Sequence, residues 1–137
     1  MMTWKPIHYA KKRVKTCTAD CMVRDAAKMF KDENMGSLIV TDEEGNHMGL
    51  FTDAVLFKAI SNGLDLRAMK LGDLDLEPIV RADKNADFGD VQGMFKESPS
   101  GRLVLYGKEG EIAGVLKRKN VERFGFYKAA SRMLRRR

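Results

Sequence analysis

Two stretches of this chain carry the same pattern of apolar and polar residues. In each, a short continuous apolar run (38–40 and 103–106) precedes a charged turn that ends in glycine, and a second apolar run follows the turn (48–51 and 113–116). Continuous apolar runs of this length are typical of strands covered on both faces. A glycine at the end of the turn supplies the positive φ that a tight reversal favours. The pattern therefore predicts two β-hairpins.

The two predicted hairpins are copies of one another. Each of five residues recurs 65 positions later in the chain: Gly36, Leu38, Glu44, Gly45 and Gly49 become Gly101, Leu103, Glu109, Gly110 and Gly114. A hairpin of this size cannot bury its own apolar faces, so it needs a helix on it and a second copy beside it. We therefore expect a tandem repeat whose two copies make one fold.

A helix is predicted on each side of the first hairpin. Apolar residues at helical spacing over 22–30 indicate the first helix, with Thr18 or Asp20 as its cap. Thr52 is a natural N-cap for the second helix, and Ser-Asn-Gly at 61–63 is expected to end it.

The second copy repeats this order with a poorer first helix. Residues 77–83 resemble 14–20 at an offset of 63, which predicts a two-residue insertion before the second hairpin. Gly89 and Gly93 fall within the expected apolar face of the next helix, and each costs about 1 kcal/mol relative to alanine. That helix is predicted to be the weakest one, and a last helix is expected from about Arg118.

Length and composition are those of a compact folded chain. At 137 residues and 44% hydrophobic content, the chain is long enough for one core of ordinary size and too apolar to be disordered. No apolar run approaches the roughly 18 residues of a membrane span, and the N-terminus lacks the apolar core of a signal peptide. We therefore expect a soluble cytoplasmic protein that does not bind membranes.

The net charge of +6 is concentrated towards the C-terminus. Residues 117–137 hold nine basic residues and one acid, so they carry +8 while residues 1–116 carry −2. Four arginines stand in the last six positions: Arg132, Arg135, Arg136 and Arg137. Clustered basic residues of this kind suit phosphate contacts, so a basic helix or arm over 125–137 is a candidate nucleic-acid site.

Cys17 and Cys21 stand four residues apart. This spacing differs from the Cys-x-x-Cys of redox sites, and the two histidines, His8 and His47, are too isolated to complete a zinc set. We interpret the cysteines as two small buried thiols near a strand-to-helix junction and assign no metal.

Three motifs now make a family resemblance visible. They are Thr-Ala-Asp at 18–20 before an alanine-bearing helix, Gly-Ser-Leu-Ile-Val-Thr-Asp-Glu-Glu-Gly at 36–45, and Gly-Leu-Phe-Thr at 49–52 opening a helix. Together with the repeat, they closely resemble a tandem pair of CBS (cystathionine-β-synthase-type) domains, also called a Bateman module. The resemblance covers roughly residues 7–124.

The resemblance implies an α/β fold of two tandem β-α-β-β-α CBS repeats packed about a pseudo-twofold axis. We place the first repeat with its N-terminal lead-in at 1–66, the second at 67–124 and the basic helix or arm at 125–137. Such modules are regulatory and commonly homodimeric. They bind adenosine-containing ligands (AMP, ADP, ATP, S-adenosylmethionine or NAD-type molecules) in clefts between the repeats. No catalytic residue is assigned, and we do not expect an enzyme.

The family pattern implies where such a ligand would bind. A Gly-h-h-Thr/Ser-x-x-Asp motif (h, apolar) at the final strand-to-helix junction gives a hydroxyl to phosphate and a carboxylate to ribose. The first copy keeps the hydroxyl as Thr52, but Val55 stands at the acid position and Asp53 lies nearby. The second copy has Lys117 and Asn120 at the two positions. Neither copy has the full set.

Two alternatives remain open at each junction. Basic residues 117–119, with Arg102, are expected either to hold a polyphosphate by charge or to form a solvated start of a helix. Thr52 is either a ligand contact or a plain helix cap. Apolar candidates would line an adenine pocket or belong to the core. The candidate ligand-binding residues are Thr16, Cys17, Cys21, Leu38, Ile39, Thr52, Asp53, Ile79, Val80, Arg102, Leu103, Lys117, Arg118 and Asn120.

Two other functions compete with nucleotide sensing. The first is binding of nucleic acid or another anionic partner through the basic arm. The second is a degenerate CBS pair that has lost its ligand and acts only in dimerisation or docking, which the missing acids favour.

Overall fold

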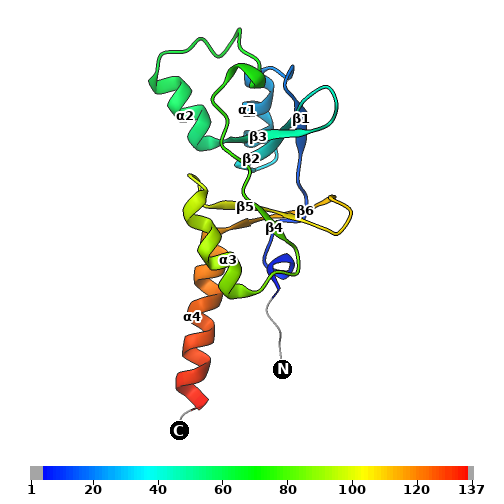
Figure 1. The fold of residues 1–137 in the computed structure, drawn as a ribbon. Coiled ribbons are helices and arrows are strands. Elements are labelled where there is room, and N and C mark those ends of the chain that lie inside the picture. Colours follow the sequence, from blue (N-terminus) through cyan, green and yellow to red (C-terminus); the bar gives the residue numbers. More distant parts are fainter. Residues whose placement is uncertain (1–4, 136–137) are drawn as a thin grey trace. The chain divides into compact units, whose positions relative to one another are not determined.

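The computed structural model describes residues 5–135, with the side chains of 124–131 and 135 left aside. The chain separates into two compact units, each of which is described here by itself (Figure 1). The first repeat forms one unit, Val14–Ile79. The described residues up to Arg13 group with Val80 and the residues that follow it to form the other.

The first repeat is built around a three-stranded sheet of order β1-β2-β3. Its elements are β1 (Thr16–Thr18), α1 (Val23–Asp32), β2 (Ser37–Thr41), β3 (His47–Thr52), α2 (Asp53–Ser61) and the short 3₁₀ helix η2 (Leu71–Asp73). β1 runs parallel to β2, and β2 forms the predicted hairpin with β3. Gly45, at φ +83°, lies in the hairpin turn as expected.

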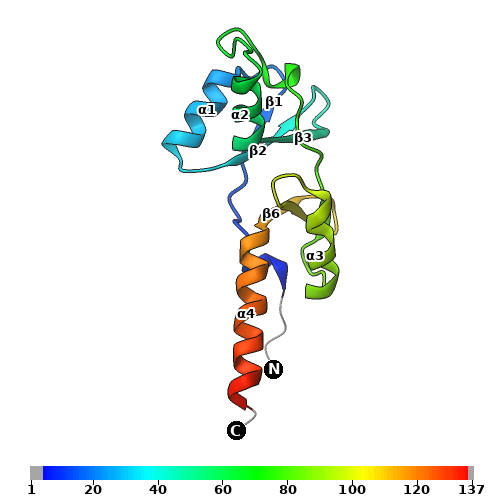
Figure 2. The same cartoon turned by 90° about the vertical axis from the view of Figure 1, so that its left-hand side faces the viewer.

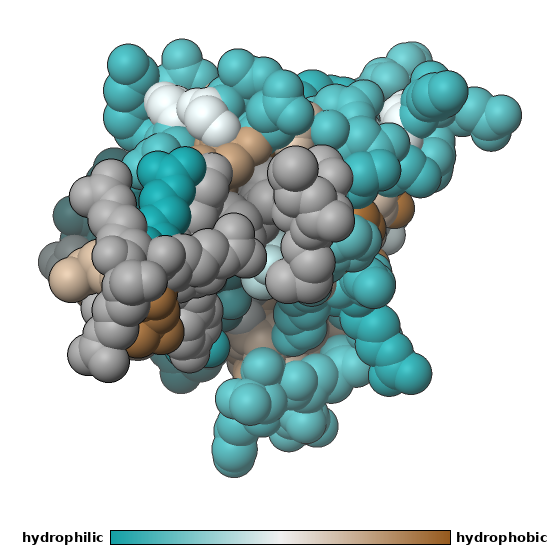
Figure 3. Space-filling view, turned by 90° about the horizontal axis from the view of Figure 1, so that it is seen from below, coloured by the Kyte–Doolittle hydropathy of each residue, from teal (hydrophilic) through white to brown (hydrophobic). Residues whose placement is uncertain are grey.

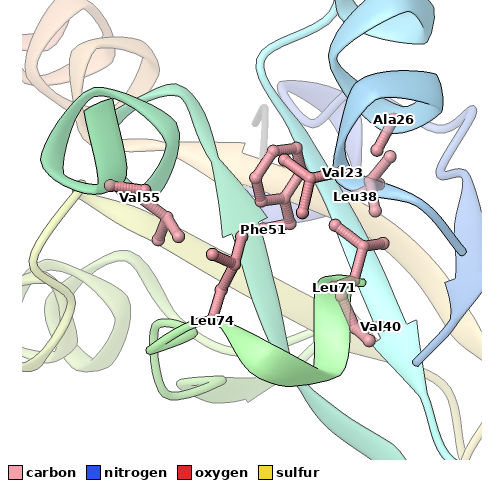
Figure 4. Close-up of a cluster of buried hydrophobic side chains, with 9 residues drawn as sticks. Val23, Ala26, Leu38, Val40, Phe51, Val55, Leu71 and Leu74 are labelled. Atoms are coloured by element: carbon pink, nitrogen blue, oxygen red, sulfur yellow. The ribbon is translucent and has the colours of Figure 1, made fainter. Parts of the chain in front are cut away.

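The core of this repeat lies between the sheet and its helices (Figure 4). Leu38 and Val40 alternate with Ile39 along β2 and therefore point to one face, where Phe51 of β3 is the ladder partner of Leu38. Both helices and the η2 segment pack on this face. They contribute Val23, Ala26, Val55, Ala59, Leu71 and Leu74.

The second repeat has the same order of elements. They are β4 (Arg81–Asp83), α3 (Phe88–Met94), the 3₁₀ helix η3 (Phe95–Glu97), β5 (Arg102–Tyr106), β6 (Ile112–Lys117) and α4 (Arg118–Arg135), with a 3₁₀ helix η1 (Pro6–His8) from the N-terminal segment. β4 is parallel to β5, and β5 is antiparallel to β6. The predicted α/β fold of two β-α-β-β-α repeats is confirmed. α4 begins where predicted and continues beyond the sheet of its own unit (Figure 2).

Strand register corrects the predicted alignment of the repeats. Cys17 is the ladder partner of Val40, and Ala82 is the partner of Leu105. Both pairs are related by 65 residues, as the hairpins are, so no insertion precedes the second hairpin. The offset of 63 was wrong because it matched two aspartates by type, whereas Asp83 corresponds by register to Thr18.

The helices before the hairpins also differ from prediction. α1 begins after Met22, with no side-chain cap from Thr18 or Asp20. In α3, a Cβ added to Gly89 or Gly93 would meet no atom within 4 Å, so both glycines lie on the open side of the helix. They are not part of its packed face, because the apolar residues that form this face stand at other positions of the helix.

Each sheet is extended by one more chain segment, which pairs with its last strand. From that segment the chain then continues into the other repeat. The backbone of Lys11 exchanges hydrogen bonds with Val115 of β6 at 2.9 and 3.0 Å. Glu77 exchanges the same pair with Leu50 of β3, also at 2.9 and 3.0 Å. The predicted boundary at residue 66, with the lead-in assigned to the first repeat, therefore differs from the division seen here. The reason is that Lys11, which was assigned to the first repeat, pairs with β6 of the second repeat. Glu77, which was assigned to the second repeat, pairs with β3 of the first.

Candidate anion-binding site

The two strand-to-helix junctions are built by the same backbone contact. The N–H of Asp53 donates to the carbonyl of Gly36 at 3.2 Å, and the N–H of Arg118 donates to the carbonyl of Gly101 at 2.9 Å. Each contact ties the start of a helix to the glycine before the neighbouring strand. The repeat therefore places residues 52–53 and 117–118 in equivalent positions, and their chemistry can be compared directly.

The first junction is capped by its own hydroxyl. Thr52 Oγ1 accepts a hydrogen bond from the N–H of Val55 at 3.2 Å, and Thr52 is completely buried. The carboxylate of Asp53 is exposed and accepts from the N–H of Ala54 at 2.9 Å. The helix-cap alternative for Thr52 is thereby confirmed, and a ligand contact by Thr52 or Asp53 stays a prediction.

At the second junction, lysine and arginine replace threonine and aspartate. Lys117 ends β6 opposite Arg102, its ladder partner at the start of β5. The loop before β5 is shaped by Ser98, whose Oγ accepts from the N–H of Arg102 at 2.9 Å, and by Gly101 at φ +68°. A Cβ on Gly101 would stand 3.3 Å from Cβ of Arg118, so the glycine allows the helix start to approach this closely.

These residues line an open hollow of about 260 Å³ in the surface of the second repeat. Its lining is Ser100, Gly101, Arg102, Lys117, Arg118 and Lys119. Four of the six carry a positive charge and none is acidic. Ser100 Oγ is buried without a hydrogen-bond partner among the described residues. The predicted gathering of Arg102 with 117–119 thus occurs in the structure, in a concave site that is suited to an anion.

One side chain of the site is held by a second contact. Nη2 of Arg118 donates to the carbonyl of Phe95 at 2.9 Å, at the end of α3. Because this bond fixes one edge of the guanidinium, Arg118 is oriented before any ligand arrives. Arg102 is 7% exposed, so its charge is held largely within the protein.

The other predicted site residues are distributed through both repeats. Leu38, Ile39 and Leu103 belong to the core and are at most 1% exposed. Ile79, Val80 and Asn120 are half-buried and Thr16 is exposed, and none of the four lines the basic hollow. Ser100 and Lys119 line it as well: Lys119 was expected there within the basic run 117–119, although it is not among the predicted ligand-binding candidates, whereas Ser100 was not expected. The signal for Lys119 was its place in the basic run, whereas nothing local in the sequence marked Ser100.

The two cysteines lie side by side at the edge of the first core. Burial is the main reason that the pKa of the Cys17 thiol is raised to about 11, and a hydrogen bond with the Cys21 side chain raises it further. Cys17 Sγ also lies 3.9 Å from Met29 Sδ. Both thiols are half-buried, as small side chains at the rim of a core.

The predicted basic arm is only partly within the described residues. Arg132 is exposed, as are Met133 and Leu134 at 74% and 72%. The side chain of Arg135 lies outside the described residues, as do Arg136 and Arg137. Within the described part of the chain, no helix combines the length and apolar character needed to cross a bilayer. Hydrophilic residues predominate among those coloured in Figure 3.

The two repeats form a paired α/β fold, and comparisons with known proteins identify its class. Residues 7–62 match the family model of the CBS domain. No curated protein sequence matches the chain. The family match thus covers most of the first repeat, and the chain as a whole has the fold of solved CBS-domain proteins.

Several solved structures share this fold at low sequence identity. A conserved CBS-domain protein of unknown function from Thermoplasma acidophilum is 21% identical, with 90% of this chain and 70% of that one covered and a TM-score of 0.77. An uncharacterised conserved protein from Pyrococcus horikoshii is 20% identical, with 91% and 94% covered and a TM-score of 0.75. The CBS-pair protein CBSX2 from Arabidopsis thaliana is 20% identical, with 99% and 100% covered and a TM-score of 0.65. CBSX2 has also been solved in complex with AMP.

Proposed function

We propose that this protein is a non-catalytic regulatory module that senses an adenosine-containing nucleotide. The observation that carries the proposal is the basic hollow, where four cationic side chains surround about 260 Å³ of space without an acid among the lining residues. The nucleotide's phosphates would occupy this hollow. AMP, ADP, ATP and NAD-type molecules are the candidate ligands, whereas S-adenosylmethionine carries no phosphate and does not suit this hollow.

The electrostatics of the helix start favour an occupied site. The first turn of a helix carries partial positive charge, so Lys117, Arg118 and Lys119 are unfavourably placed beside the start of α4. A bound phosphate would reverse this balance, since it accepts hydrogen bonds from the free N–H groups of the helix and neutralises the side chains. Ser100 adds a hydroxyl that is not otherwise used by the described residues.

The chemistry of the junction also predicts a ranking of ligands. Val55 and Asn120 stand where the family pattern has an acid for the ribose hydroxyls, so ribose recognition by a carboxylate is lost at both positions. Affinity then depends more strongly on the phosphates. We expect ATP to bind more tightly than AMP, and AMP more tightly than adenosine. That CBSX2, which shares the fold, is known in complex with AMP supports the choice of a nucleotide.

Calorimetric titration of the purified protein with ATP, AMP and adenosine tests this proposal. Lys117→Glu and Lys119→Glu should each weaken ATP binding by tenfold or more, because a hydrogen bond to a charged group contributes about 1.5–3 kcal/mol. Lys108→Glu is the matched control. It makes the same charge change at an exposed position in the turn of the second hairpin and should leave the affinity within about twofold, since charges outside the site are screened.

Equal affinity for ATP and adenosine would contradict a phosphate site in the hollow. Absence of binding by every adenosine compound would favour the degenerate module that acts only in docking or dimerisation.

Self-association is proposed separately, on the exposed face of α2. Phe57 and Ile60 are 65% and 54% exposed, and Leu64 just beyond the helix is 43% exposed. Apolar side chains gathered in this way commonly mark an interface, and we propose that a second copy of the chain covers them in a homodimer. Sedimentation of Phe57→Glu should report a monomer where the wild type reports a dimer. A wild type that is monomeric at all concentrations would contradict the dimer.

Binding of nucleic acid through the basic arm remains the competing proposal. It rests on the exposed Arg132 and the three arginines that follow. Removal of residues 132–137 should abolish salt-dependent binding to single-stranded or duplex oligonucleotides if the arm carries the function. Unchanged binding, or none in the full chain, would exclude it.

A further inference from the structure

Three sulfur-bearing side chains, at positions 17, 21 and 29, pack beside the core of the first repeat. Cys17 belongs to β1, Cys21 to the turn that follows, and Met29 to the second half of α1. Cys17 Sγ lies 3.9 Å from Met29 Sδ, and the Cys21 thiol, which donates to the carbonyl of Met22 at 3.8 Å, lies close enough to raise the pKa of Cys17. All three residues pack against the core cluster while remaining partly exposed. The cluster is therefore both assembled by the fold and open to solvent.

The second repeat shows that this fold does not need the two thiols. The strand register relates Cys17 to Ala82 by 65 residues, and the same offset relates Cys21 to Ala86 and Met29 to Met94. Ala82, Ala86 and Met94 contribute to the second core in the same way. Methyl groups therefore suffice for packing at both cysteine positions, and the thiols of the first repeat add chemistry beyond what the core requires.

We propose that Cys17, Cys21 and Met29 form a binding site for a soft monovalent metal ion, with Cu(I) as the biological candidate. Thiolate and thioether sulfur are soft donors that select Cu(I) over hard cations. A structural zinc site requires four ligands from cysteine, histidine or carboxylates, and no group of three or more such residues gathers anywhere in the described chain. A set of two thiols and one thioether matches an ion that is satisfied by few sulfur ligands.

Binding exchanges protons for the ion. Each cysteine that becomes a thiolate ligand releases one proton to solvent, so one Cu(I) and two thiols give a complex of charge −1 and two protons. Nothing is oxidised or reduced in this step. The ion enters from the solvent side, where both thiols retain exposed surface.

The sequence-based assignment of no metal rested on the spacing of the cysteines and on the isolation of the two histidines. It had no access to Met29, which is 12 residues from Cys17 and joins the cluster only because α1 packs on the sheet. The second core supplies a matched control, because Met94 occupies the same place without thiols beside it.

The test is a titration of the reduced full-length protein with Cu(I) under nitrogen, against a chromophoric Cu(I) chelator, with native mass spectrometry for stoichiometry. We expect one ion per chain in the wild type and no tight binding in the Cys17→Ala/Cys21→Ala double variant, which copies the second repeat. Met29→Leu should weaken binding by about tenfold or more, since even outer-shell changes cost that much in metal sites. Met94→Leu should leave it unchanged.

Retention of the ion by the double variant, or equal affinities of Met29→Leu and wild type, would overturn the three-sulfur site. X-ray absorption at the copper edge of the wild type provides a readout that needs no variant. A shell of three sulfurs supports the assignment, and a shell of nitrogen or oxygen ligands overturns it.

Discussion

Thr52 contributes to the fold through a single oxygen atom. Its hydroxyl accepts from the N–H of Val55 at 3.2 Å in a completely buried position, where no water is available to replace it. Such a cap spans only three residues, so the sequence could predict it from the residue type and the apolar pattern that follows. The equivalent residue in the second repeat is Lys117, which cannot accept a hydrogen bond, and α4 starts without this support.

Thr52→Ala should therefore lower the free energy of unfolding by about 1–2 kcal/mol. The buried N–H of Val55 loses its partner, whereas Thr52→Ser keeps the oxygen and should retain most of the stability. Urea denaturation of the three proteins measures the difference. Equal losses for the alanine and serine variants would mean that the methyl group, rather than the hydroxyl, matters.

Cys17 should react slowly with thiol reagents. A pKa of about 11 instead of 9.0 lowers the thiolate fraction at pH 8 by about a hundredfold. The higher intrinsic nucleophilicity of a more basic thiolate offsets about tenfold of this, so alkylation of Cys17 should be about tenfold slower in the folded chain than in urea. Because the native thiol holds its proton more tightly, stability should also fall as pH rises above about 9 and level off above about 11.

Alkylation with iodoacetamide, followed by mass spectrometry of the Cys17 peptide, measures the rate. Equal rates in folded and unfolded chains would contradict the protection.

At the scale of elements, the glycines divide into two groups that the sequence does not distinguish. A Cβ on Gly49 would stand 2.8 Å from the carbonyl oxygen of Glu77, and one on Gly114 would stand 3.0 Å from that of Lys11. Both glycines allow the extra chain segment to pair with the last strand of its sheet. Gly89 and Gly93 of α3, in contrast, have open space around them.

Gly89→Ala and Gly93→Ala should each stabilise the protein by up to about 1 kcal/mol, because they lower the backbone entropy of the unfolded chain and favour helix. Gly49→Ala and Gly114→Ala should destabilise it by about 1–3 kcal/mol through overpacking. Thermal unfolding of the four variants gives the signs. Stabilisation by Gly114→Ala would contradict the close passage of Lys11.

The elements show which features of this chain are encoded locally. Both hairpins, the helix cap and the offset of 65 between the hairpins could be predicted, because each depends on residues close together in sequence. The pairing of Lys11 with Val115 and the contact of Cys17 with Met29 could not, since they bring together segments with no shared pattern. In the candidate site, their charge allowed Arg102 and 117–119 to be predicted from the sequence. Ser100 could be recognised only from the geometry of the loop in the structure.

At the scale of the whole molecule, the N-terminal segment belongs to the repeat at the other end of the chain. Lys11 closes the edge of β6, and Ile7 and Ala10 pack against the second core. The chain therefore cannot be divided at one point into two self-contained repeats.

Deletion of the residues before Val14 should expose the edge of β6. The amide of Val115, which donates to the carbonyl of Lys11 at 3.0 Å, should exchange with deuterium much faster, while that of Leu50, held by Glu77, should keep its protection. Hydrogen exchange followed by NMR measures both amides in one experiment. Unchanged protection of Val115 would mean that the N-terminal segment does not belong to the unit that contains the second repeat.

The central claim is that the basic hollow of the second repeat holds the phosphates of a nucleotide. NMR titration of the ¹⁵N-labelled protein with ATP, and separately with tripolyphosphate, tests it most directly. The account predicts that the amide signals of Gly101 and Arg118 move in both titrations and saturate, and that Lys117→Glu removes both responses. Signals of Gly101 and Arg118 that stay in place at high ATP concentration would contradict it.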